Sequence, residues 1–139
     1  MRSNVNLARI VRACGCSGVQ RVICCGTAKI EEKIARDGAR HVQLEIHRTL
    51  PPVLQQLGRE GYRRVGLEQT TDSTDLHHYR FVAKSVLVVG NERTGLTDDL
   101  LEQLDVVVEI PVYGLPYSYN AATATAMALY EYCRQFPDG

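Results

Sequence analysis

Three short segments of the sequence combine residue types that could do chemistry. In the first, Arg9 and Arg12 are three residues apart and therefore share one side of a helix. A guanidinium fork suits phosphate and carboxylate groups, and an arginine partly buried beside an apolar stripe needs such an anionic partner. The alternative is a solvated arginine whose stem covers apolar surface, and the spacing alone slightly favours this alternative.

The second segment, residues 88–96, reads Val-Val-Gly-Asn-Glu-Arg-Thr-Gly-Leu. A buried strand would run into a loop with glycines at positions 90 and 95, and such a loop can bring backbone N–H groups to a ligand. It is not a Walker A loop, because no Gly-Lys-Ser/Thr follows, and it is not Gly-x-Gly-x-x-Gly. An ordinary strand-to-helix turn, with Glu92 and Arg93 in solvent, stays open as the simpler interpretation.

The third segment, residues 110–120, reads Ile-Pro-Val-Tyr-Gly-Leu-Pro-Tyr-Ser-Tyr-Asn. A strand would end in a loop that leads to a helix, with Ser118 and Asn120 at the helix start. Capping by Asn120 is the simple explanation. However, the small residues at 121, 122, 124, 126 and 128 would let a ligand, a threaded chain or a partner subunit pack very close to this helix.

The elements that must position these segments alternate along the chain. Apolar patterns predict strands at 19–25, 42–46, 64–69, 86–89 and 106–112, of which 42–46 should have one exposed face. They predict helices at 6–16, 28–38, 51–58, 96–104 and 120–134, with a polar loop at 72–79. Asn6 should cap the first helix and Gly18 should end it. The alternation predicts an α/β fold with a mostly parallel sheet and helices on both faces, in which ligands bind beyond the carboxyl ends of the strands.

The composition predicts one ordinary globular domain. The chain has 139 residues, of which 45% are apolar, so disorder is excluded as its main state. Sixteen basic residues balance sixteen acidic ones, which argues against a uniformly basic nucleic-acid-binding surface. Thirteen of the basic residues are Arg, which favours specific clamping of phosphates over bulk attraction.

Neither a membrane segment nor a metal site is expected. No apolar run approaches ~18–20 residues, and the first ten residues lack an apolar signal core, so we expect a cytoplasmic protein. The cysteines do not have the C-x₂-C spacing of zinc sites, and buried free thiols are the favoured interpretation. These residues are Cys14, Cys16, Cys24, Cys25 and Cys133.

Taken together, the three segments resemble the SpoU (TrmH) family of the SPOUT superfamily of RNA methyltransferases. The first matches the motif Asn-x-Gly-x-x-x-Arg at Asn6 and Arg12. The second matches Gly-x-Glu-x-x-Gly-Leu at residues 90–96, and the third matches Ile-Pro-Met…Ser-Leu-Asn-x-Ser at Ile110, Pro111, Ser118 and Asn120. The chain departs from these motifs at Ala8, Val112, Tyr119 and Ala122, and only a few residues precede Asn6, where family members carry a further strand.

The resemblance implies a single SpoU-type domain over residues 1–139, with a deep C-terminal trefoil knot and no added RNA-binding domain. It implies a homodimer that binds S-adenosylmethionine in the knot and transfers the methyl group to a ribose 2′-hydroxyl, with tRNA preferred over rRNA as the substrate. The implied cofactor contacts are Leu67, Gly90, Ile110, Ser118 and Tyr119. The implied catalytic residues are Asn6, Arg12, Glu92, Ser118 and Asn120, and the implied RNA contacts are Arg9, Arg12 and Arg93.

Arg12 would have the central role, for which two interpretations exist. It could hold the phosphate beside the target ribose, or it could act as a general base, which the usual arginine pKa above ~12 makes difficult. Two other classes of protein compete with the enzyme. One is a SPOUT-like RNA-binding dimer that has lost catalysis, suggested by Ala8 and Ala122. The other is a nucleotide-binding α/β protein that uses the loop from Gly90 to Gly95.

Overall fold

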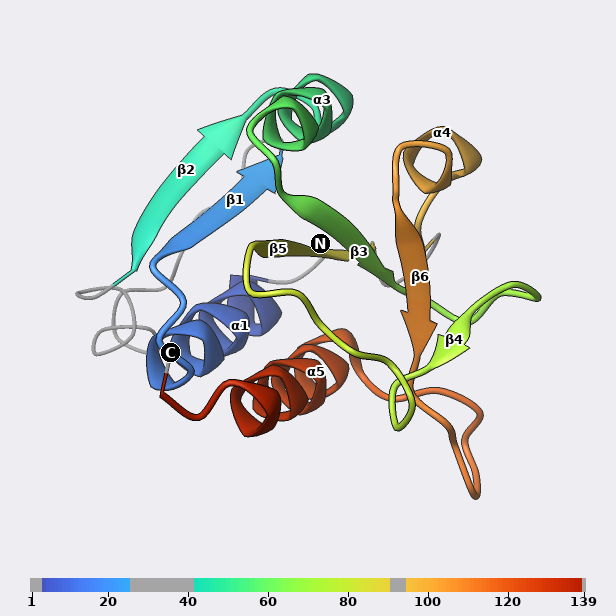
Figure 1. Ribbon diagram of the computed structural model, residues 1–139. Helices are drawn as coiled ribbons and strands as arrows, with labels where there is room; N and C mark the ends of the chain where they lie inside the picture. The colour runs from blue at the N-terminus through green and yellow to red at the C-terminus, as the bar shows by residue number, and fades with distance from the viewer. Residues whose placement is uncertain (1–3, 26–41, 91–94, 139) are drawn as a thin grey trace.

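The computed structural model describes residues 4–25, 42–90 and 95–138 (Figure 1). Its helices are α1 (Asn4–Cys16), α3 (Pro51–Arg59), α4 (Asp98–Leu101) and α5 (Ala121–Gln135). Its strands are β1 (Arg21–Cys25), β2 (Gln43–His47), β3 (Arg63–Leu67), β4 (Thr74–Asp75), β5 (Ser85–Val89) and β6 (Val106–Glu109). The helix predicted at 28–38 lies outside the described residues.

All paired strands in the described part of the chain run parallel, which confirms the α/β class. They form two sheets, one made of β1 and β2 and one with the order β4-β6-β3-β5. The sequence did not indicate β4, which lies within the predicted loop at 72–79. Thr74 and Asp75 carry no apolar pattern, and they are extended because they pair with Val108 and Glu109 of β6.

Helices cover both faces of the four-stranded sheet, as predicted. Helices α1 and α5 lie side by side below the sheets in Figure 1, and α3 and α4 lie above. Neighbouring residues of one strand show the same two-sided packing: in β5, Leu87 packs with the clusters that involve α1 and α5, while Val88 packs with Leu54 of α3 and Leu96. The core is therefore divided between two faces of a parallel sheet.

The first helix differs from its prediction at its start. It begins at Asn4, so the expectation that Asn6 caps it is wrong. Asn6 is only 7% exposed and is four residues from Ile10, which is also buried, so burial on the inner face of the helix outweighs the local preference for a cap. At the other end Gly18 terminates the helix as predicted, with φ +77° and a Val19 N to Cys14 O hydrogen bond of 2.9 Å.

The apolar pattern predicted the packed leucines around α4 correctly, but it overestimated the lengths of α4 and β6. Helix α4 covers only Asp98–Leu101 of the predicted 96–104, although Leu96 and Leu104 still pack in its core cluster. Strand β6 ends at Glu109 and not at residue 112. In β2, Ile46 is 52% exposed, so the predicted division between an inner and an outer face is wrong at this residue.

The cysteines are free, but they are not uniformly buried. Cys14 and Cys24 are buried, Cys25 and Cys133 are partly buried, and Cys16 is exposed. Burial raises the pKa of the Cys14 thiol to about 11. No group of three potential metal ligands occurs within residues 4–25, 42–90 and 95–138. None of the helices in these ranges has the length and apolar character that a bilayer crossing requires.

Glu45 links the two strands of the smaller sheet. Its carboxylate accepts hydrogen bonds from Arg21, including one of 3.1 Å from Nη2 to Oε1, and Oε1 lies 3.2 Å from His47 Nε2. The hydrogen bonds from Arg21 and then from His47 lower the pKa of Glu45 from 4.5 to about 2.

Acid should weaken the folded state through Glu45, and Glu45→Gln should remove that part of the pH dependence. Because the folded-state pKa is depressed, the stabilisation is complete above about pH 4.5 and is lost as the pH falls towards about 2. Urea unfolding midpoints measured across this range should therefore fall less steeply for Glu45→Gln. Glu102→Gln, at an exposed position, is the matched control and should keep the wild-type slope. Identical slopes for Glu45→Gln and the wild type would contradict the prediction.

Candidate functional site

Three of the residues predicted to bind the cofactor meet at one edge of the larger sheet. Leu67 is the last residue of β3, Gly90 follows the end of β5 and Ile110 follows the end of β6. These strands are neighbours, and Leu67 is in register with both Val89 and Val108. The carboxyl ends of adjacent parallel strands therefore bring the three positions together, at the place where such sheets bind ligands.

The second segment requires glycine at positions 90 and 95 because its two ends pack closely together. A Cβ atom at Gly90 would lie 2.4 Å from the carbonyl carbon of Gly95 and 2.6 Å from the backbone nitrogen of Leu96. Gly95 itself has φ +64°, a conformation that other residues rarely adopt. The two glycines thus allow the backbone at the start of the segment to contact the backbone at its end. The predicted site residues Glu92 and Arg93 lie outside the described residues.

Glu68 is part of this arrangement, although no motif of the sequence assigned it a role. Its Oε2 atom accepts a 2.9 Å hydrogen bond from the backbone nitrogen of Leu96, and its Oε1 atom accepts one of 3.1 Å from the backbone nitrogen of Gln69. A carboxylate near the end of the strand predicted at 64–69 was the only local signal. What it contacts becomes visible only once β3 and the second segment are brought together.

The third segment leaves the sheet as an exposed loop. Ile110 is buried at its start, whereas Tyr113, Leu115 and Tyr117 are between 76% and 84% exposed. Ser118, Tyr119 and Asn120 are also exposed. The side-chain oxygen of Asn120 accepts hydrogen bonds from the backbone nitrogens of Ala122 (2.9 Å) and Thr123 (3.4 Å), which confirms the predicted cap of α5.

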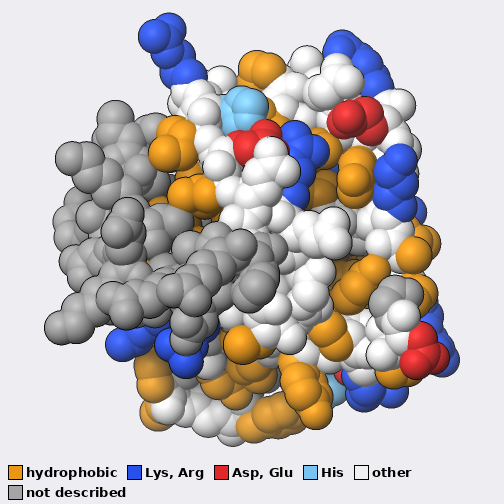
Figure 2. All heavy atoms as spheres, turned by 90° about the vertical axis from the view of Figure 1, so that its left-hand side faces the viewer, with side chains coloured by type: hydrophobic (Ala, Val, Ile, Leu, Met, Phe, Trp, Pro, Cys, Tyr) orange, Lys and Arg blue, Asp and Glu red, His pale blue; other side chains and the backbone are white. Residues whose placement is uncertain are grey.

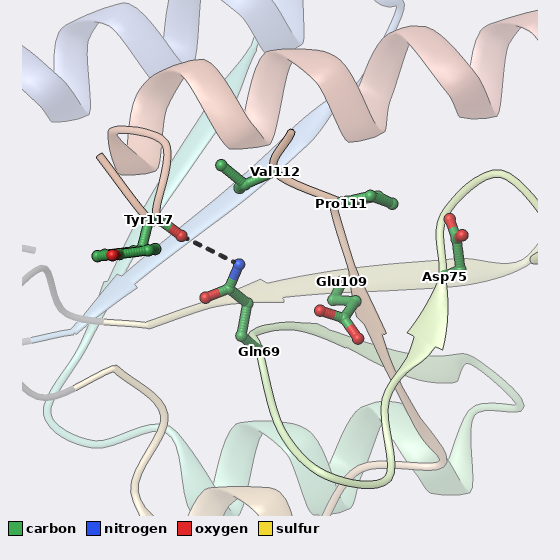
Figure 3. A pocket seen from close by; sticks show the side chains of 6 residues that line it. All are labelled: Gln69, Asp75, Glu109, Pro111, Val112 and Tyr117. Carbon is green, nitrogen blue, oxygen red and sulfur yellow. Dashed lines mark hydrogen bonds between the residues drawn. The ribbon is translucent and has the colours of Figure 1, made fainter. Parts of the chain in front are cut away.

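A hollow of about 480 Å³ lies beside this edge (Figure 3). Gln69 and Tyr117 close one side of it, where Gln69 Nε2 donates a 3.3 Å hydrogen bond to the carbonyl oxygen of Tyr117. This bond joins the residues after β3 to the loop after β6. Asp75 and Glu109 line the other part with Pro111 and Val112, and no sequence pattern pointed to these two acids.

The arginines of the first segment lie on α1, the helix that packs beside α5. Arg9 and Arg12 are both exposed, and within the described ranges neither makes a hydrogen bond or ion pair. Their exposure agrees with the solvated interpretation as far as the described residues are concerned. Figure 2 shows the side of the molecule nearest β1, β2 and α1, where Lys and Arg side chains lie in several separate places, some of them beside acidic side chains.

The chain is thus a parallel α/β protein in which Gly90 packs against the Gly95–Leu96 peptide at the carboxyl ends of the strands. The chain belongs to the SpoU rRNA Methylase family, whose model matches residues 1–130. The resemblance inferred from the three motifs is thereby confirmed.

Relatives and solved structures agree with this assignment. The tRNA (guanosine(18)-2′-O)-methyltransferase of Aquifex aeolicus is 30% identical over 97% of this chain and 66% of that protein. The mouse tRNA (guanosine(18)-2′-O)-methyltransferase TARBP1 is 50% identical over 59% of this chain, which is 5% of the mouse protein. The chain thus spans less than two thirds of the length of either relative.

The solved structures match over nearly the whole chain. The A. aeolicus TrmH/SpoU tRNA modifying enzyme has a TM-score of 0.92 at 29% identity and covers 99% of this chain and 72% of that one. The SpoU methyltransferase AviRb from Streptomyces viridochromogenes, in complex with AdoMet, has a TM-score of 0.84 at 26% identity and covers 99% of this chain and 55% of that one.

Proposed function

We propose that the chain transfers a methyl group from S-adenosylmethionine to a ribose 2′-hydroxyl of RNA, with tRNA preferred over rRNA. The observation that carries the proposal is the meeting of Leu67, Gly90 and Ile110 at one edge of the parallel sheet. The name of the A. aeolicus relative supports the reaction and the tRNA substrate, and the AviRb complex supports the cofactor.

The residues at this edge fit the cofactor. Backbone groups at Leu67, Gly90 and Ile110 would hold it, together with Ser118 and Tyr119 from the third segment. A Cβ atom at Gly90 would collide with the backbone of Gly95 and Leu96, so only glycine permits the close backbone contact that shapes this edge. The bound cofactor supplies the methyl group on an electrophilic sulfonium. By the family resemblance we further propose that the second and third segments form a deep trefoil knot around it.

The task of the protein is to align a weak nucleophile, the 2′-hydroxyl, with that methyl group. We assign Arg12 the role of holding the phosphate beside the target ribose, because a guanidinium fork binds phosphate and is a poor proton acceptor. Arg9 and Arg93 would extend the contact along the RNA. Asn6, on the same helix, would orient the ribose, and Glu92 would fix the second segment.

The third segment would complete the substrate side of the site. Ser118 and Asn120 would line the approach of the ribose. Because the Asn120 oxygen is already engaged in capping α5, its amide group could serve the substrate only as a donor. The exposed side chains of Tyr113 and Tyr117 offer faces on which RNA bases could stack.

We propose a cytoplasmic homodimer built from one domain per chain, in which the first segment of one copy completes the site of the other. Arg12 makes no hydrogen bond to any residue that the structure describes, and α5 exposes Tyr130 (76%) beside small residues. Sedimentation equilibrium at micromolar concentration should therefore give the mass of a dimer. A monomer with full methyl-transfer activity would contradict this assembly.

Two measurements test the proposed function. Calorimetry with S-adenosylmethionine should show binding, and incubation with the methyl-labelled cofactor and RNA should move label into tRNA more than into rRNA. Binding without transfer to either RNA would favour the alternative of an RNA-binding protein that has lost catalysis. Absence of cofactor binding would contradict the proposal itself.

A further inference from the structure

The carboxylate of Glu68 acts as a clamp, because it binds two backbone N–H groups that are distant from each other in the sequence. It receives two backbone N–H groups, one from its own neighbour Gln69 and one from Leu96, at 3.1 and 2.9 Å. Hydrogen bonds from backbone amides to an ionised carboxylate are among the stronger ones in proteins. Glu68 thereby connects the carboxyl end of β3 to Leu96, the last residue of the second segment.

Gly95 shows how closely this clamp fits. A Cβ atom at Gly95 would lie 2.1 Å from Glu68 Oε2, and the nearest atoms around it all belong to Glu68. The carboxylate is the flexible end of a side chain and could swing away from such a Cβ atom. In doing so it would lose its hydrogen bond to the Leu96 nitrogen.

The peptide between Gly95 and Leu96 is therefore held from two sides. Glu68 binds it through the Leu96 nitrogen, and Gly90 packs against it so closely that a Cβ atom there would be 2.6 Å from the same nitrogen. Leu96 follows with only 6% exposure and packs with Leu54 and Val88. Glu68 supplies the side-chain hydrogen bond in this arrangement, and backbone packing and the Leu96 side chain supply the rest.

We propose that Glu68 is a positioning residue, whose carboxylate fixes the Gly95–Leu96 peptide against Gly90 and so sets the affinity of the adjacent edge for S-adenosylmethionine. The statement about affinity rests on the proposed function. The hold of Glu68 on the peptide is independent of that function and can be measured without any cofactor, as the hydrogen-exchange rate of the Leu96 amide.

Four variants test the clamp. Glu68→Ala removes both acceptors, and Glu68→Gln retains one oxygen in place of two. Gly95→Ala should push the carboxylate off Leu96, and the double variant Glu68→Ala/Gly95→Ala should relieve this collision. Gly18→Ala is the matched control, because Gly18 also has a positive φ (+77°) but no atom lies within 4 Å of its Cβ position.

The Leu96 amide should exchange at least about 10-fold faster in Glu68→Ala and in Gly95→Ala than in the wild type, and by an intermediate factor in Glu68→Gln. In the double variant the two effects should not add, since either change alone breaks the same bond. Gly18→Ala should leave the exchange of Leu96 unchanged. A wild-type exchange rate in Glu68→Ala, or simple additivity in the double variant, would overturn the proposal.

Cofactor affinity, measured by calorimetry, is the second readout. The dissociation constant for S-adenosylmethionine should rise at least about 10-fold in Glu68→Ala and be partly rescued in Glu68→Gln, while the midpoint of global unfolding changes little. Faster Leu96 exchange with an unchanged dissociation constant would show that Glu68 does not set the affinity for S-adenosylmethionine. Absence of binding by the wild type would overturn the proposed function, and the exchange experiment would still decide whether Glu68 holds the peptide.

Discussion

Arg12→Ala is expected to lower kcat/KM for methyl transfer to RNA by at least about 100-fold, with the cofactor affinity unchanged. Arg12 is exposed and makes no hydrogen bond to any described residue, so its removal costs little folding free energy. The loss would come from a target ribose that is no longer held in line with the methyl group. Steady-state kinetics with labelled cofactor measure the first effect, and calorimetry measures the second.

Two further variants give this experiment its controls. Arg59→Ala removes an exposed arginine from α3, on the opposite side of the sheet, and should leave transfer unchanged. Arg12→Lys keeps the charge but loses the planar fork, so it should fall between the wild type and Arg12→Ala. Full turnover by Arg12→Ala would show that Arg12 has no role in positioning the substrate.

Gly90→Ala should abolish binding of S-adenosylmethionine and lower the free energy of unfolding by about 1–3 kcal/mol. The added Cβ atom would lie 2.4 Å from the Gly95 carbonyl carbon, and backbone atoms cannot move aside as a side chain can. The two ends of the second segment would have to separate, which displaces the backbone at the cofactor edge. Calorimetry and urea unfolding measure the two effects.

Gly114→Ala is the control for this substitution. Gly114 lies in the exposed loop after β6, its φ is not positive, and no atom lies within 4 Å of its Cβ position. Its free energy of unfolding should stay within about 0.5 kcal/mol of the wild-type value. Wild-type cofactor affinity in Gly90→Ala would mean that the close contact with Gly95 is not needed for binding.

Features that depend on neighbouring residues were predictable from the sequence. Gly18 ends α1, Asn120 caps α5, and Gly90 follows a buried strand, because each of these roles is set by a few adjacent positions. The alternation of helices and strands predicted the parallel sheet, and the family resemblance indicated Leu67 and Ile110 as partners of Gly90 at its ligand edge. The parallel fold and its ligand edge could therefore be expected without a structure.

Features that depend on distant contacts were not predictable in this way. Asn6 has the character of a cap but is buried within a helix that begins earlier, at Asn4. Thr74 and Asp75 form a strand only because β6 lies beside them. Glu68 finds its partner at Leu96, across the sheet edge, and no local pattern connects these two residues.

The most direct test of ribose methylation by this chain is the position of the transferred methyl group on the RNA. The wild-type chain would be incubated with methyl-labelled S-adenosylmethionine and tRNA, and the RNA would be digested to nucleosides and separated by mass spectrometry. We expect label on the ribose 2′-oxygen, and none when Arg12→Ala replaces the wild type. Label on a base, or cofactor binding with no labelled nucleoside at all, would contradict it.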